Sequence, residues 1–150
     1  MPIYMNWGNS VPPRIRGDVT AASHVGWIEL FSVQAGVQRA IPTPTGKSRQ
    51  PETGLTRYDL VISKATDSSS APLHRATVLL ENTTVLIDFV KIDRGKPVVV
   101  MQYKLTDTLI SGYSMCGGVR PMESLSLNFG KLEWGQGQGV TPHMTVPPRW

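Results

Sequence analysis

The sequence predicts an all-β protein, a sandwich or a barrel, with one short helix packed against it. Short runs rich in Val, Ile, Leu, Tyr and Phe recur with turn signals between them, and several alternate apolar and polar residues with period two. A single segment instead has apolar residues at helical spacing. Short strands at this spacing favour a sandwich or barrel over alternating βαβ units.

The predicted strands follow one another along the whole chain. They cover residues 25–34, 57–64, 84–92, 97–105 and the two arms of a hairpin within residues 108–134. Between the third and fourth strands, residues 93–96 read DRGK, which predicts a tight hairpin turn because Gly95 is free to take a positive φ.

The predicted helix covers residues 72–81. A serine before it can cap the first turn, and Pro72 suits a first helical turn. The apolar stripe that would lie on the sheet consists of Leu73, Ala76, Thr77 and Leu80, at spacings i, i+3, i+4 and i+7.

Two segments are not expected to contribute core strands. Residues 41–56 form a long connection with three prolines, two glycines and no apolar periodicity, and connections of this length are usually functional or disordered. Residues 135–150 are rich first in Gly and Gln and then in Pro, a composition that builds core strands poorly.

The last hairpin has a regular polar face. Ser124, Ser126 and Asn128 alternate with apolar residues, and the apolar phase changes at Gly130, which predicts a β-bulge there. The polar face is either the solvated side of a half-buried sheet or a surface of small residues that lines a cavity or contacts another chain.

The short motifs in the chain do not indicate catalysis. Residues 44–48 read PTGKS, but the leading glycine of a phosphate-binding loop is missing and two prolines remove N–H donors, so we expect a surface turn. The RGD triplet at residues 16–18 is also expected to turn the chain. No nucleophile elbow is present, and Cys116 lies in a Gly-rich loop with nothing nearby in the sequence to lower its pKa.

Metal and cofactor sites are not predicted either. His24, His74 and His143 lie in a loop, on the helix and near the C-terminus, without a spacing that places two of them on one metal. We therefore expect a protein that is not an enzyme and needs no cofactor.

Length, charge and the N-terminal sequence limit the remaining classes of protein. The 150 residues suit one domain, and Cys116 alone cannot form an intrachain disulfide. No basic N-terminal segment precedes a long apolar run, so we expect a cytoplasmic protein that leaves the cell, if at all, without a cleaved signal peptide. The net charge of +4 raises the possibility of nucleic-acid binding, but the basic residues are scattered and lack interleaved aromatics.

In combination, several blocks resemble one known family. Residues 1–9, 16–30, 69–91 and 108–134 are similar, in this order, to the hemolysin-coregulated proteins (Hcp) of bacterial type VI secretion systems. The resemblance covers roughly residues 1–134 and implies a closed antiparallel β-barrel of two sheets with one flanking helix. Residues 135–150 would then form a Gly/Pro-rich C-terminal tail.

The resemblance also implies a function. Such proteins assemble into hexameric rings that stack into a tube, carry small toxic effectors in the lumen, and work with sheath and spike components. The implied lumen or interface face consists of Ser114, Met115, Cys116, Ser124, Ser126 and Asn128. The candidate ring-stacking residues, in and beside the long connection, are Lys47, Arg49, Glu52 and Arg57. The alternatives are an OB-like barrel that binds single-stranded nucleic acid and a phage-like tail-tube subunit.

Overall fold

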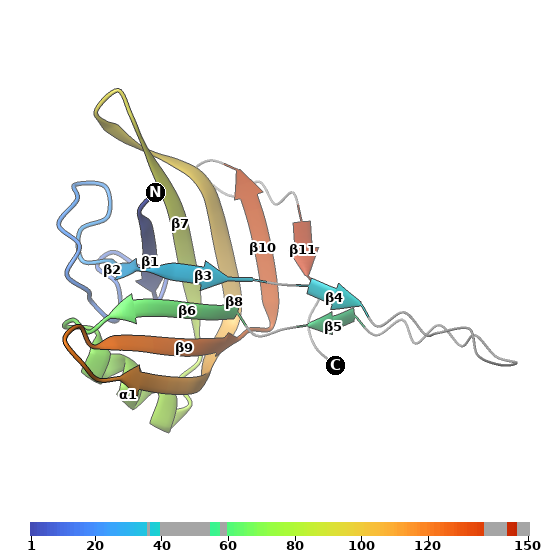
Figure 1. The fold of residues 1–150 in the computed structure, drawn as a ribbon. Helices are drawn as coiled ribbons and strands as arrows, with labels where there is room; N and C mark the ends of the chain where they lie inside the picture. The colour runs from blue at the N-terminus through green and yellow to red at the C-terminus, as the bar shows by residue number, and fades with distance from the viewer. Residues whose placement is uncertain (36, 40–54, 58–59, 137–143, 147–150) are drawn as a thin grey trace, which may run out of the picture.

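The protein is mainly β, with antiparallel strands and one helix (Figure 1). The computed structural model describes residues 1–35, 37–39, 55–57, 60–136 and 144–146. Its elements are β1 (Ile3–Trp7), β2 (Ile28–Leu30), β3 (Ser32–Gln34), β4 (Val37–Arg39), β5 (Leu55–Arg57), β6 (Leu60–Ala65), α1 (Ser70–Leu79), β7 (Thr83–Asp93), β8 (Lys96–Cys116), β9 (Met122–Asn128), β10 (Lys131–Gln136) and β11 (Met144–Val146).

Two sheets share the long strand β8. Its first half pairs with β7 and β10, and with β1, β2 and β11 these strands make the first sheet. Its second half pairs with β9, which continues through β6 to β3 as the second sheet. Asp107 has a φ of 53° between the two halves, so the strand changes direction there and serves both sheets.

The strand expected at residues 25–34 is in fact split. Residues 25–27 precede the sheet, β2 lies at one edge of the hydrogen-bonded path, and β3 lies at the other edge. Phe31 alone separates them, and its N–H donates to the carbonyl of Ser63 at 2.7 Å. The two edges are therefore joined by the chain, and no ladder closes the path within the described strands, so the closed barrel is not confirmed in its full form.

The hydrophobic core fills the space between the two sheets. Its buried members come from both sheets, from α1 and from the segments at Ile15 and Phe129. They are Met5, Trp7, Ile15, Ile28, Leu30, Leu60, Ile62, Leu73, Ala76, Val85, Ile87, Tyr103, Leu105, Ile110, Leu125, Leu127, Phe129 and Leu132. In both sheets, the apolar residues of the alternating strands thus point inward, as expected for two packed layers.

The helix begins two residues earlier than expected and ends earlier. The Asp67 side chain accepts the N–H of Ser69 at 2.9 Å, so the chain already turns before Pro72. Leu80 takes a left-handed φ of 53° and ends the helix. Leu73 and Ala76 of the expected stripe are buried, but Leu80 is exposed.

The hairpin turn predicted at residues 93–96 is confirmed. Arg94 and Gly95 both have positive φ, 50° and 75°, as a two-residue turn of type I′ requires. Asp93 pairs with Lys96, and the ribbon of β7 and β8 extends beyond the body of the molecule (Figure 1).

The C-terminal segment contributes more strand than its composition suggests. β10 continues to Gln136, and β11 pairs with β10 although it lies within the predicted tail. The division of the chain at residue 134 stays a prediction.

Gly130 does not form the expected bulge. β9 ends before it in the second sheet and β10 begins after it in the first, so Gly130 is the corner between two sheets. Its N–H donates to the carbonyls of Thr106 and Asp107, at 2.9 and 3.2 Å. The apolar phase changes because each strand must point its apolar side at the core from a different sheet.

Gly130→Val should destabilise the protein more than Ser126→Ala. A Cβ at position 130 would lie 3.1 Å from the Asp107 Cβ and 3.4 Å from the Thr106 carbonyl oxygen, so the corner would have to shift by a few tenths of an ångström. We expect a loss of about 1–2 kcal/mol for Gly130→Val and less than about 0.5 kcal/mol for the serine variant. Equal urea midpoints of the two variants would contradict this role of the corner.

Candidate assembly surfaces

The outward face of the second sheet carries small uncharged side chains. Ser32, Ser63, Ser124 and Ser114 lie opposite one another on β3, β6, β9 and β8. The next row across the same strands consists of Gln34, Val61, Ser126 and Gly112. We call these two rows, with Cys116, Met122 and Asn128, the serine face. None of these described positions carries a charge.

The serine face can make close, hydrogen-bonded contacts. Its central residues are half-buried, and the Ser32 and Ser63 hydroxyls hydrogen-bond to each other. Short side chains allow another chain to approach closely, and hydroxyl and amide groups can both donate and accept. Such a face suits packing against a protein chain better than binding an ion.

Five of the six predicted face residues come together here. Ser114, Cys116, Ser124, Ser126 and Asn128 share the outward side by their pairing register. Met115 does not, because it lies opposite Glu123, on the side of β8 and β9 that faces the helix. It is nevertheless exposed near the end of β8.

Of the predicted ring-stacking residues, only one is described. Lys47, Arg49 and Glu52 lie outside the described residues, and Arg57 is the last residue of β5, opposite Val37 of β4. The ribbon of β4 and β5 leaves the body sideways, whereas the hairpin of β7 and β8 projects upward in the same view (Figure 1).

A buried ionic cluster lies behind the serine face. Lys64 of β6 and Glu123 of β9 are cross-strand partners without solvent access, with Nζ and Oε2 2.6 Å apart. Lys64 Nζ also lies 2.9 Å from Asp67 Oδ1 and 3.2 Å from Ser70 Oγ, at the start of α1. The Tyr113 hydroxyl donates to the other Glu123 oxygen. The cluster joins β6, β8, β9 and the helix.

Sequence reasoning missed this cluster although a signal was present. Lys64 follows Leu60 and Ile62 at period two, and Glu123 precedes Leu125 and Leu127 at the same period. Two opposite charges that stand on the apolar side of two strands indicate a buried pair.

A second buried cluster holds the loop before β2 against the first sheet. His24 Nε2 lies 2.8 Å from Asp88 Oδ2, and the Ser23 hydroxyl lies 2.7 Å from His24 Nδ1. Gln102 Nε2 donates to the other Asp88 oxygen at 2.5 Å. The His24 ring packs against Tyr4 and Trp27. Among the described residues, no buried side-chain nitrogen or oxygen lacks a hydrogen-bond partner, which fits an anchoring role for this cluster.

The histidines are not brought together. His24 is buried in the loop cluster, His74 packs on Tyr113 beside the helix, and His143 lies outside the described residues. Within the described ranges, no group of three His, Cys, Asp or Glu side chains could hold a metal ion. In the same part of the chain, no helix has the length and apolar character to cross a membrane.

Asp18 ties the loop to the start of the helix. The Ser68 hydroxyl and N–H both donate to its carboxylate, and these bonds hold the pKa of Asp18 below its ordinary value of 3.8. A carboxyl with a lowered folded-state pKa stabilises the fold above its ordinary pKa, and this contribution disappears as the pH falls through the folded-state value.

Ser68→Ala should therefore destabilise the protein at pH 7 more than at pH 3. The variant removes the hydroxyl donor to Asp18, so its stability deficit is largest where Asp18 is ionised in both states. Urea unfolding of both proteins from pH 7 to pH 3 measures the deficit. In an Asp18→Asn background the deficit should not depend on pH, and a constant deficit in the wild-type background would contradict the prediction.

Comparisons with known proteins give one consistent result. A family model described as Type VI secretion system effector, Hcp, matches residues 4–135. No curated protein matches the chain. Among solved structures, a doubly substituted mutant of Hcp1 from the E. coli EAEC 042 pathovar has a TM-score of 0.79 at 19% identity, with 98% of this chain and 99% of that chain covered.

Two further structures agree with this similarity. A protein described as Hcp has a TM-score of 0.81 at 15% identity, with 99% of this chain and 98% of that chain covered. The secreted protein Hcp3 of Pseudomonas aeruginosa has a TM-score of 0.72 at 17% identity, with 98% and 99% covered. At these identities the structures establish a shared fold.

Proposed function

The chain belongs to the Hcp family of type VI secretion proteins, and we propose that it is a tube subunit whose copies form hexameric rings that stack and carry small effectors in the lumen. The two sheets act as a closed barrel in this assembly, with the chain at Phe31 joining their edges. The protein is made in the cytoplasm and exported inside a sheath and behind a spike. It performs no chemistry of its own.

The serine face is the observation that supports assembly most directly. An isolated, solvated sheet face usually carries charged residues, yet the described positions of this face carry none. A tube needs each subunit to present one surface to the lumen and others to its neighbours. Small hydroxyl and amide groups suit either role, because they pack closely against a protein surface.

Native mass spectrometry and negative-stain microscopy test the ring. We expect a hexamer mass and particles with a central hole. A side-to-side contact between two different surfaces closes into a ring when its rotation fits. A monomer mass at tens of micromolar would contradict the proposal, and a monomer that shifts an oligonucleotide with steep salt dependence would favour the OB-like alternative.

A bulky substitution separates the two roles of the serine face. Ser126→Trp adds a large side chain to the middle of the face, while Val119→Trp adds the same group to the exposed turn between β8 and β9. If the face lines the lumen, Ser126→Trp rings should keep their mass and lose effector export. If the face contacts a neighbour, the rings should not form.

The segment around residues 45–54 is proposed to affect stacking of rings. Its candidate contacts, Lys47, Arg49, Glu52 and Arg57, are polar, and each would contribute under about 1 kcal/mol at an interface rim. Replacing residues 45–54 by a Gly-Ser linker should leave single rings and abolish tubes and secretion. Collapse to monomers would place the segment in the side-to-side contact.

A further inference from the structure

The two ends of strand β7 carry opposite features. β7 begins at Thr83, just after the end of α1, and ends at Asp93 in the hairpin turn. Its 11 residues, at about 3.3 Å each, place the two ends roughly 35 Å apart. Figure 1 shows the hairpin and the helix at opposite ends of the molecule.

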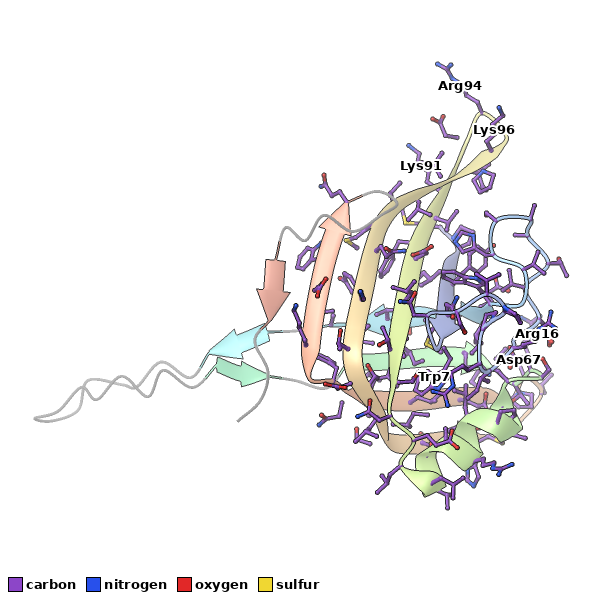
Figure 2. All side chains as sticks on the ribbon, turned by 180° about the vertical axis from the view of Figure 1, so that it is seen from behind. Trp7, Arg16, Asp67, Lys91, Arg94 and Lys96 are labelled. Atoms are coloured by element: carbon purple, nitrogen blue, oxygen red, sulfur yellow. The ribbon has the colours of Figure 1, made fainter. Side chains whose placement is uncertain are left out.

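The hairpin end is basic and apolar. We call residues 91–98 the basic hairpin: Lys91, Arg94 and Lys96 lie on it, and Figure 2 shows all three at the projecting end. Its apolar residues are also open to solvent, with Ile92 58% and Val98 44% exposed. In the described part of the chain, none of the three cations forms an ion pair.

The helix end is acidic and apolar. Val78, Leu79 and Leu80 are 70%, 53% and 68% exposed at the end of α1, and Glu81 beside them is exposed as well. Asp107 is exposed at the same end, because its neighbour Thr108 pairs with Thr83. We call these five residues the acidic end.

The carboxylates of the acidic end have cations nearby: Arg14 donates to Thr83 Oγ1 at 3.4 Å, and Lys131 pairs with Thr106, next to Asp107. The last turn of α1 has no basic residue, although the C-terminus of a helix carries a partial negative charge that a cation would stabilise. Among the described residues, neither Glu81 nor Asp107 forms an ion pair. The end therefore presents an apolar patch beside two carboxylates that form no ion pair among the described residues.

We propose that the basic hairpin of one copy docks on the acidic end of the next copy, so that subunits join end to end with one polarity. The inference rests on the proposed stacking of rings and adds two surfaces that meet in the stack to the segment at residues 45–54. Ile92 and Val98 would cover Val78, Leu79 and Leu80, while Arg94 and Lys96 approach Glu81, Asp107 and the helix carbonyls. Burial supplies the attraction, and the charges set the orientation.

The same features exclude the other ways of joining two copies by these ends. Two hairpins that met would oppose like net charges, since each carries Lys91, Arg94 and Lys96 against Asp93 alone. Two acidic ends would oppose carboxylates to carboxylates. A contact between unlike surfaces at opposite ends repeats without closing and generates a filament. A nucleic acid could use the cations but would leave the apolar residues of both ends uncovered.

Cross-linking of two cysteine variants tests the contact. In the full chain with Cys116→Ser, one preparation carries Asp93→Cys and another Asn82→Cys, two exposed positions beside the proposed contacts. We expect a mixed disulfide dimer when the two are combined under mild oxidation, and little dimer from either alone. Equal cross-linking of each variant with itself, or no mixed dimer, would overturn the proposal.

Charge reversal tests the electrostatic part. Arg94→Glu with Lys96→Glu on the Asp93→Cys chain should lower the yield of mixed dimer at least tenfold. Glu81→Lys with Asp107→Lys on the Asn82→Cys chain should restore the lost yield. The matched control is Arg120→Glu, which reverses an exposed charge outside both surfaces and should leave the yield unchanged. Loss without restoration would overturn the charge pairing.

Native mass of the same samples keeps this proposal distinct from the ring. Mixed dimers without hexamers would leave the end-to-end contact standing and refute the ring. Hexamers without mixed dimers would leave the ring standing and refute the contact. Failure of the mixed dimer together with tight oligonucleotide binding that Arg94→Glu abolishes would identify a nucleic acid as the partner of the hairpin.

Discussion

Replacing Lys64 by methionine should lower the free energy of unfolding by about 3–5 kcal/mol. The substitution keeps the length of the side chain but removes the ammonium group that lies 2.6 Å from Glu123 Oε2. Glu123 has no solvent access, so its carboxylate would lose its cation without gaining water. Urea unfolding at pH 7 measures the loss.

Two further variants show whether the loss of stability comes from breaking the Lys64–Glu123 pair or from a lysine-to-methionine change as such. Lys104→Met, at a half-buried position facing outward on β8, should change stability by less than about 0.5 kcal/mol. Lys64→Met combined with Glu123→Met should cost less than the sum of the single variants, because neither charge is then stranded. A Lys64→Met protein as stable as Lys104→Met would contradict the assignment.

The buried pair also offers a physical reason for the pairing register of β6 with β9. Leu60 and Ile62 alternate with polar residues on β6, and Leu125 and Leu127 do so on β9. A slip of two residues would keep every apolar side chain on the core side, so alternation alone specifies the register weakly. Only the observed register places Lys64 opposite Glu123. We expect the double methionine variant to broaden the backbone amide resonances of these strands.

Local features of the sequence predicted the hairpin and the helix well. The turn at Gly95 depends on two adjacent residues with positive φ, and the strands on each side have regular alternation. The helix was located to within two residues, because its spacing and its proline are also local signals. Its start was misjudged because the Asp67 side chain and the buried Ser70 fix the first turn.

Changes of sheet could not be predicted from local pattern. Phe31 lies between β2 and β3, which belong to different sheets, and Gly130 lies in the same way between β9 and β10. In the sequence, both positions lie within runs that resemble one strand or one bulged strand. Alternation shows which side of a strand a residue points to, but it does not show to which sheet the strand belongs. The bend of β8 at Asp107 has the same origin: a φ of 53° at an ordinary aspartate has no sequence signature.

The sequence identified only part of the serine face, because alternation does not show which strands pair. Ser124, Ser126 and Asn128 share one side of β9 by alternation alone. Their neighbours Ser32 and Ser63 come from distant segments, and only the register of the sheet brings them into the same row. Met115 was included with the face that the family resemblance implies, but it follows Ser114 directly, and adjacent residues of a strand point to opposite sides.

Gly17→Ala should destabilise the protein by about 3 kcal/mol. A Cβ at this position would lie 2.4 Å from the Trp27 carbonyl oxygen and 2.6 Å from the Ile28 Cα. Both are backbone atoms, so a rotamer change cannot relieve the contact. The turn expected for the RGD triplet is wrong: Gly17 runs beside residues 26–28, and its N–H donates to the Gly26 carbonyl at 2.8 Å.

We expect the substitution at Gly17 to displace the edge of the first sheet and the loop that holds the buried His24. Ile28 is the first residue of β2, which pairs with β1, and His24 lies in the loop that the displaced backbone would pull. We expect a lower urea midpoint and faster hydrogen exchange in β1 and β2. Gly117→Ala is the matched control, since nothing lies within 4 Å of its added Cβ, and it should shift stability by less than about 1 kcal/mol. If the two alanine variants unfold at the same urea concentration, the prediction is contradicted. The close approach of residue 17 to β2 would then not explain why this position carries a glycine.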